Sequence, residues 1–118
     1  MMDQAYMQNL QQAMKSNSHI KVINNTAENG DDYRIKPFET LVIIDNDGSY
    51  TQDIFLPYVA ESAGMILTIL VPDFGGGGTI ADNDDSQSDW SDLTMNADDE
   101  YAILMNTGRG WIKLVSDM

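Results

Sequence analysis

Short apolar runs alternate with clusters of Gly, Asn, Asp and Pro along most of the chain, which is a β pattern rather than a helical one. The runs predict strands over residues 20–22, 33–35, 40–44, 49–56, 65–71, 79–81, 101–105 and 111–115. Asn46-Asp47-Gly48 carries the signature of a hairpin turn, and no internal repeat is apparent. The pattern predicts a mainly β fold, a small antiparallel β-sandwich or barrel.

The N-terminal segment carries a different pattern, with apolar side chains at helical spacing. Asp3 is a suitable N-cap for a helix from about Gln4 to Lys15. The apolar stripe of this helix consists of Tyr6, Met7, Leu10 and Met14. So short a helix is marginal on its own in water, so the segment must dock on its own domain or on another chain. We therefore divide the chain into an N-terminal helix or arm, residues 1–18, and a β-domain, residues 19–118.

Several expected strands are apolar on both faces rather than alternating between apolar and polar residues. This holds for residues 41–44, 54–56, 66–71 and 103–105. In an isolated sandwich one face of each sheet meets water and is polar, so strands of this kind need a second cover. The cover is either the N-terminal helix or a neighbouring subunit, and we expect the protein to be an oligomer.

Charge narrows the range of partners. The 118 residues make one domain, and 6 Lys+Arg against 19 Asp+Glu give a formal net charge of −13. Between Lys36 and Arg109 there is no basic residue, whereas the same stretch carries fourteen acids. Such a surface repels phosphate backbones and anionic lipid headgroups, so we expect no nucleic-acid and no membrane partner. The longest apolar run, residues 65–71, is far short of a membrane span.

The residue types that carry most enzyme chemistry are scarce. The chain has no cysteine, which removes disulfides, thiolate nucleophiles and zinc fingers, and His19 is its one histidine. No nucleophile elbow surrounds any serine. We therefore expect no enzyme activity, no catalytic residue and no cofactor. A hydrolase that uses two of the many acids stays as an alternative, although most of these acids lie in polar, turn-rich segments.

Two loops and the aromatic residues offer candidate binding sites. Gly75 to Gly78 lack the Lys and the following helix of a phosphate-binding loop, so a hinge or close-packing loop is expected. The acidic run from Asp82 to Asp92 has oxygen ligands that calcium prefers, but a solvated loop is the default and no metal site is assigned. Trp90 or Trp111, with this acidic loop, would suit a carbohydrate-binding module, although aromatic residues in small β-domains are more often core or interface.

Several short pieces of the chain together resemble a known class of domain. They are Phe55-Leu56-Pro57, Ala63-Gly64-Met65-Ile66, residues 79–82, residues 93–101 and Gly108-Arg109-Gly110-Trp111-Ile112. The order of these pieces resembles small β-domains of tailed-bacteriophage virion proteins. Such domains occur in capsid decoration (cement) proteins and in tail-fibre or spike modules, and are often trimeric. The resemblance covers roughly residues 40 to 115 and leaves out the N-terminal helix.

The resemblance implies an assembly role with no catalytic residues to transfer. It implies a capsid decoration protein, a homotrimer that binds the major capsid protein or another virion protein and is assembled into the particle in the host cytoplasm. Leu56, Pro57, Gly64 and Trp111 would hold structural positions. With the N-terminal stripe included, the expected interface residues are Tyr6, Met7, Leu10, Met14, Leu56 and Trp111. A tail-fibre, head-fibre or spike module is the alternative within this class, and a carbohydrate-binding module is the alternative outside it.

Overall fold

A computed structural model describes residues 19–27, 29–46, 48, 50–82 and 92–118. The expected N-terminal helix, residues 1–18, lies outside the described residues, and so do Trp90 and most of the acidic loop. Among the described residues no helix is long and apolar enough to cross a membrane.

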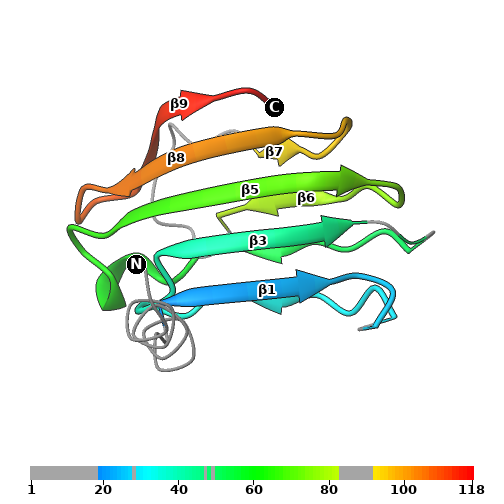
Figure 1. Ribbon diagram of the computed structural model, residues 1–118. Helices are drawn as coiled ribbons and strands as arrows, with labels where there is room; N and C mark the ends of the chain where they lie inside the picture. The colour runs from blue at the N-terminus through cyan, green and yellow to red at the C-terminus, as the bar shows by residue number, and fades with distance from the viewer. Residues whose placement is uncertain (1–18, 28, 47, 49, 83–91) are drawn as a thin grey trace, which may run out of the picture.

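Two sheets form a sandwich (Figure 1), which confirms the mainly β fold expected from the sequence. The five-stranded sheet has the order β1 (Ile20–Asn24), β3 (Leu41–Asn46), β5 (Ile66–Phe74), β8 (Glu100–Asn106) and β9 (Trp111–Ser116). The four-stranded sheet has the order β2 (Tyr33–Arg34), β4 (Ile54–Phe55), β6 (Thr79–Ala81) and β7 (Leu93–Thr94). A short 3-10 turn, η1 (Val59–Glu61), lies between β4 and β5.

The strand pairing is mixed rather than antiparallel. β1, β3 and β5 pair in parallel, and β2, β4 and β6 do the same in the other sheet. This follows from the chain path, because after each of these strands the chain crosses to the opposite sheet and returns in the original direction. Asn46-Asp47-Gly48, expected to close a hairpin, lies on one of these crossings between β3 and β4. The expected hairpin around residues 106–110 does form, between β8 and β9.

The parallel pairing shows an internal repeat that is not apparent in the sequence. Ile20 pairs with Leu41 in one sheet and Tyr33 pairs with Ile54 in the other, and both pairs are 21 residues apart. One strand from each sheet makes up one coil of the chain, so β1 with β2 is the first coil and β3 with β4 is the second. These two coils are therefore equivalent turns of a short solenoid. The third coil breaks the period, because η1 lengthens the connection before β5 and the register shifts after Ile43. The antiparallel strands β7, β8 and β9 then close one end of the sandwich.

The core lies between the two sheets, where inward-facing side chains alternate with outward-facing ones. On β3, Val42 and Ile44 are fully buried, whereas Leu41 and Ile43 are half-buried. The largest fully buried apolar side chains are Ile23, Ile35, Ile44, Ile54, Leu56, Leu67, Ile69, Ile80, Met95, Leu104 and Trp111. Both sheets contribute to this set, so their packing against each other accounts for most of the apolar burial.

A buried asparagine holds each of the first two coils to the next one. The side-chain oxygen of Asn25 accepts the Gly48 N–H (2.9 Å), and its amide donates to the carbonyl of Tyr50 (2.8 Å). Asn46 stands one coil later and does the same with the glycine loop: its Oδ1 accepts the N–H groups of Gly75, Gly76 and Gly77 (3.2, 2.8 and 2.8 Å). A buried amide thus replaces the backbone partners that these tight turns lack.

The glycine loop is a close-packing loop, one of the two roles expected for it. A Cβ at Gly76 would overlap the backbone carbonyl of Tyr50, and one at Gly78 would overlap the carbonyl of Gln52. The loop therefore packs directly against the backbone of the preceding coil, so closely that only glycine fits at these two positions.

Candidate functional site

The most distinctive surface is the outer face of the five-stranded sheet, meaning the side chains of β1, β3, β5, β8 and β9 that point away from the four-stranded sheet. One row of neighbours crosses four strands and consists of Val22, Ile43, Leu70 and Tyr101. A second row crosses all five and consists of Ile20, Leu41, Thr68, Ile103 and Val115. A third consists of Ile66, Met105 and Ile112. Apart from Thr68 and the Tyr101 hydroxyl, the three rows are apolar.

Several of these side chains are open to solvent in the single chain. Val22 on the edge strand β1 is 58% exposed, and Ile66 at the start of the central strand β5 is 52% exposed. Val115 on the other edge strand, β9, is 45% exposed. The face is about 19 Å across five strands and about 20 Å along them, from the usual strand spacing and rise. That is roughly 400 Å², the size at which an apolar patch on a single chain is often functional.

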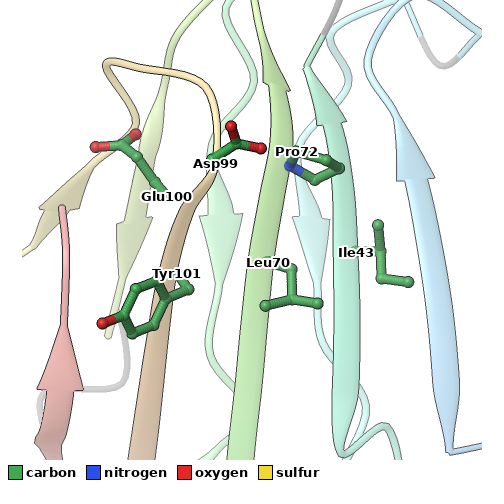
Figure 2. A pocket seen from close by; sticks show the side chains of 6 residues that line it. All are labelled: Ile43, Leu70, Pro72, Asp99, Glu100 and Tyr101. Carbon is green, nitrogen blue, oxygen red and sulfur yellow. The ribbon is translucent and has the colours of Figure 1, made fainter.

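A hollow of about 380 Å³ lies on this face (Figure 2). Ile43, Leu70 and Tyr101 line it, and Pro72 and Asp99 stand at its end near the carboxyl end of β5. A concave apolar floor with one charged group at its rim suits an apolar side chain from a partner better than a polar substrate.

Glu100 also lines the hollow, but its carboxylate has a structural role. Its Oε1 accepts the N–H groups of Asn96 (2.7 Å) and Ala97 (3.0 Å), and the residue is buried. These bonds hold the turn that leads from β7 into β8. Asp99, just before it, adopts a left-handed backbone with φ of 62° and is exposed.

The basic residues of the first coil engage aromatic rings near the β1–β2 edge. The ammonium groups of Lys21 and Lys36 each lie 4.8 Å from the centre of the Tyr33 ring. The Tyr33 hydroxyl donates to Glu39 (2.7 Å) and accepts from Lys36 (3.1 Å). Burial and the hydrogen bond to Glu39 raise the pKa of Tyr33, and the hydrogen bond to Tyr33 raises the pKa of Lys36. Because Lys21 and Tyr33 cover the open end of the solenoid, this cluster is a cap rather than an anion site.

Arg34 is similarly engaged on the four-stranded sheet. Its guanidinium lies 4.0 Å from the centre of the Tyr58 ring and 5.4 Å from that of Phe55. It also donates to the carbonyl of Leu56 (2.7 Å). These contacts leave little of the guanidinium for a ligand.

Two of the expected interface residues are core residues in this chain. Leu56 is fully buried, and Trp111 is 1% exposed with its indole N–H donating to the carbonyl of Pro57 (3.0 Å). Neither side chain reaches a partner, because both point between the sheets. The other four, Tyr6, Met7, Leu10 and Met14, lie outside the described residues.

The burial of Trp111 also removes it from the expected sugar platform, since its ring has no open face for stacking. The histidine and the acids do not gather into a site: within the described part of the chain no three His, Cys, Asp or Glu side chains are placed to hold a metal ion. His19 lies at the start of β1, where Nδ1 is 2.6 Å from the carbonyl oxygen of Phe38.

The exposed residues of the outer face were not among the interface residues expected from the sequence. These are Val22, Ile66, Leu70, Tyr101, Ile112 and Val115. The signal for them was present, because three of the four segments that are apolar on both faces, residues 41–44, 66–71 and 103–105, lie in this sheet. The fourth, residues 54–56, lies at β4 of the other sheet. What the sequence lacked was a way to tell the inner face from the outer one.

The comparisons with known proteins show a likeness in fold. No family model matches the chain, and no curated protein matches it. The solved structure of residues 132–251 of StcE, from enterohemorrhagic E. coli, is similar with a TM-score of 0.51 and 17% sequence identity. The similarity covers 84% of this chain and 92% of that fragment. At this identity the match supports the sandwich architecture and nothing more specific.

Proposed function

We propose that this chain is a non-enzymatic structural protein of a tailed-phage virion, a capsid decoration protein that assembles as a homotrimer through its outer face. The observation that carries the proposal is the apolar outer face itself, with three rows of side chains across five strands. Leaving such a face in water is unfavourable by roughly 25 cal/mol for each Å² that a partner would cover. A surface of this kind is typical of a chain that functions in an assembly.

The size of the face supports a contact shared between subunits. A stable interface buries about 800 Å² on each partner, whereas the flat area of the outer face is roughly half of that. The face is therefore the centre of an interface, with its rim supplied by β9 and by the polar residues around it. The side chains that an interface of this kind would bury first are Tyr101, Ile112 and Val115.

The virion setting rests on the resemblance of residues 40 to 115 to phage virion β-domains. The net charge of −13 is compatible with it, because an acidic outer surface keeps large particles soluble and mutually repelling. The role of the domain in such a particle is to bridge or strengthen the shell. The partner is the major capsid protein or another virion protein.

Attachment to shells tests the proposal. Purified full-length chain is mixed with emptied heads of the phage that encodes it, and the copies bound per head are counted after sedimentation. We expect saturable binding at a fixed ratio, reduced at least tenfold by Ile112→Asp on β9. Ala60→Asp adds the same charge at an exposed position of η1 and is the matched control. Absence of saturable binding, or equal binding by both variants, would overturn the proposal.

A further inference from the structure

The occupant of the outer face next to β1 can be identified from the chain itself. We infer that the N-terminal segment, residues 1–18, docks its apolar stripe on the outer face over β3 and β5. The inference rests on the proposed function and deepens it, since it names the part of the protein that completes the assembly surface. It is carried by where the segment joins the sheet, by its length, and by the shape and charge of the surface beside it.

The segment joins the fold at the edge of this sheet. The carbonyl of His19 accepts the N–H of Leu41 (3.0 Å), so residue 19 is held beside β3 at the beginning of β1. Because β1, β3 and β5 are parallel, this point lies at the end of the sheet where all three strands begin. The break at Ser16-Asn17-Ser18 is just long enough to turn the chain from the strand onto the outer face.

The length of the expected helix matches the face. Twelve residues, Gln4 to Lys15, make a helix about 18 Å long, against about 20 Å of strand from Ile66 to Pro72. A helix is about 10 Å across, so one helix covers about two strand spacings, or half of the width of the sheet. The half formed by β8 and β9 remains for contact with another subunit.

The stripe matches the surface chemically. It offers Tyr6, Met7, Leu10 and Met14 to a floor built from Val22, Ile43 and Leu70. Methionine is flexible enough to fill an irregular hollow, and the hollow of about 380 Å³ is lined on this side by Ile43, Leu70 and Pro72 and extends to the start of β8. The polar Gln and Asn side of the helix would then face solvent.

Charge favours one direction of the helix. With residue 15 near the start of β1, the helix runs back along the strands and begins near the carboxyl end of β5. Asp73 and Asp99 are exposed at that end. Carboxylates stabilise the positive end of a helix dipole, so Asp73 and Asp99 would act on the dipole together with the expected N-cap Asp3.

The same geometry sets a register that can be tested. Leu10 lies five residues before Lys15, or about 7.5 Å along a helix. Thr68 lies in the same row across the sheet as Ile20, at the start of β1. Leu70 lies two residues beyond Thr68, or about 6.6 Å further along the strand. Leu10 is therefore expected above Leu70, with Met14 closer to Leu41.

Cross-linking tests the inference, and a chain without cysteine gives a clean background. The full-length double variant Leu10→Cys/Leu70→Cys is treated with a short bismaleimide. Gln12→Cys/Leu70→Cys moves the first thiol to the opposite side of the expected helix. Leu10→Cys/Thr94→Cys moves the second thiol to an exposed position on the four-stranded sheet. We expect the first pair to cross-link at least fivefold faster than either control.

Equal rates in all three variants, or no cross-link in the first, would overturn the inference. Circular dichroism checks that each variant folds, and Met14→Cys/Leu41→Cys is the second test pair if Leu70→Cys does not fold. A product at the mass of one chain means that the segment docks on its own sheet, and one at twice that mass means that it docks on a neighbouring copy. Both support docking on this face. The native mass of the untreated wild type tests the proposed oligomer separately.

Discussion

Replacing Asn46 with alanine removes the side chain that holds the glycine loop to the preceding coil. Asn46 is fully buried, and its Oδ1 accepts the N–H groups of Gly75, Gly76 and Gly77. Its amide donates to the carbonyl of Gly77 (2.9 Å). The alanine variant leaves all of these backbone groups without that partner, in a place where the surrounding backbone is too close to rearrange.

The size of the effect follows from the number of groups left unpaired. A buried polar group without a partner costs about 1–3 kcal/mol. The two N–H bonds of 2.8 Å and the donated bond are the strong ones, and part of their loss is recovered where water reaches the loop. We expect a loss of about 3–5 kcal/mol of the free energy of unfolding, against about 5–15 kcal/mol for a typical domain.

Urea unfolding followed by circular dichroism measures this loss. With a slope of about 2 kcal/mol per M, the midpoint should fall by about 2 M. Asn96→Ala is the control, because Asn96 is exposed, and it should stay within about 0.5 kcal/mol of wild type. A loss below about 1 kcal/mol for Asn46→Ala would refute the reasoning, since the loop would then be held by other contacts.

Three further substitutions test the packing of the glycine loop and the cap of the first coil. Gly76→Ala should lower the free energy of unfolding by about 3 kcal/mol or more, because its Cβ would overlap the Tyr50 carbonyl. Gly64→Ala has open space around its Cβ and should lose only the left-handed backbone penalty of about 1–2 kcal/mol. Equal losses in melting temperature for the two variants would contradict this. Folding raises the pKa of Tyr33 through burial and Glu39, so its stabilisation is complete below the unfolded pKa near 10.0 and is lost as the pH rises through the folded pKa. The melting temperature should therefore fall more steeply above pH 10 in wild type than in Tyr33→Phe, and parallel profiles would count against the assignment.

The sandwich was predictable from the sequence, but its strand pairing was not. Strand length, turn residues and apolar runs are local properties, and they predicted most of the strands that the structure contains. Asn46-Asp47-Gly48 shows the limit of such signals, because the same residues that suit a hairpin also suit a turn between two sheets. Turn residues indicate where the chain bends, but they do not indicate which strand the chain pairs with next.

The repeat and the apolar outer face were each visible in part in the sequence. Asn25 and Asn46 are 21 residues apart, and the side-chain oxygen of each accepts a glycine N–H of the next coil. The residues around them differ enough to hide this period in the sequence. The strands apolar on both faces predicted apolar residues outside the core, and the structure has them on the outer face of the five-stranded sheet. Leu56 and Trp111 were expected at an interface but are core residues. The sequence does not distinguish an apolar residue on the inner face from one on the outer face, because the packing of the two sheets decides which face becomes the core.

Light scattering on the purified full-length chain tests the central claim, that the outer face of the five-stranded sheet is an assembly surface. The account predicts a native mass about three times the 13.1 kDa of one chain. Ile112→Asp should reduce it to the mass of one chain, and Ala60→Asp should leave it unchanged. A wild-type protein at 13.1 kDa, or an Ile112→Asp variant that keeps the oligomeric mass, would contradict the claim.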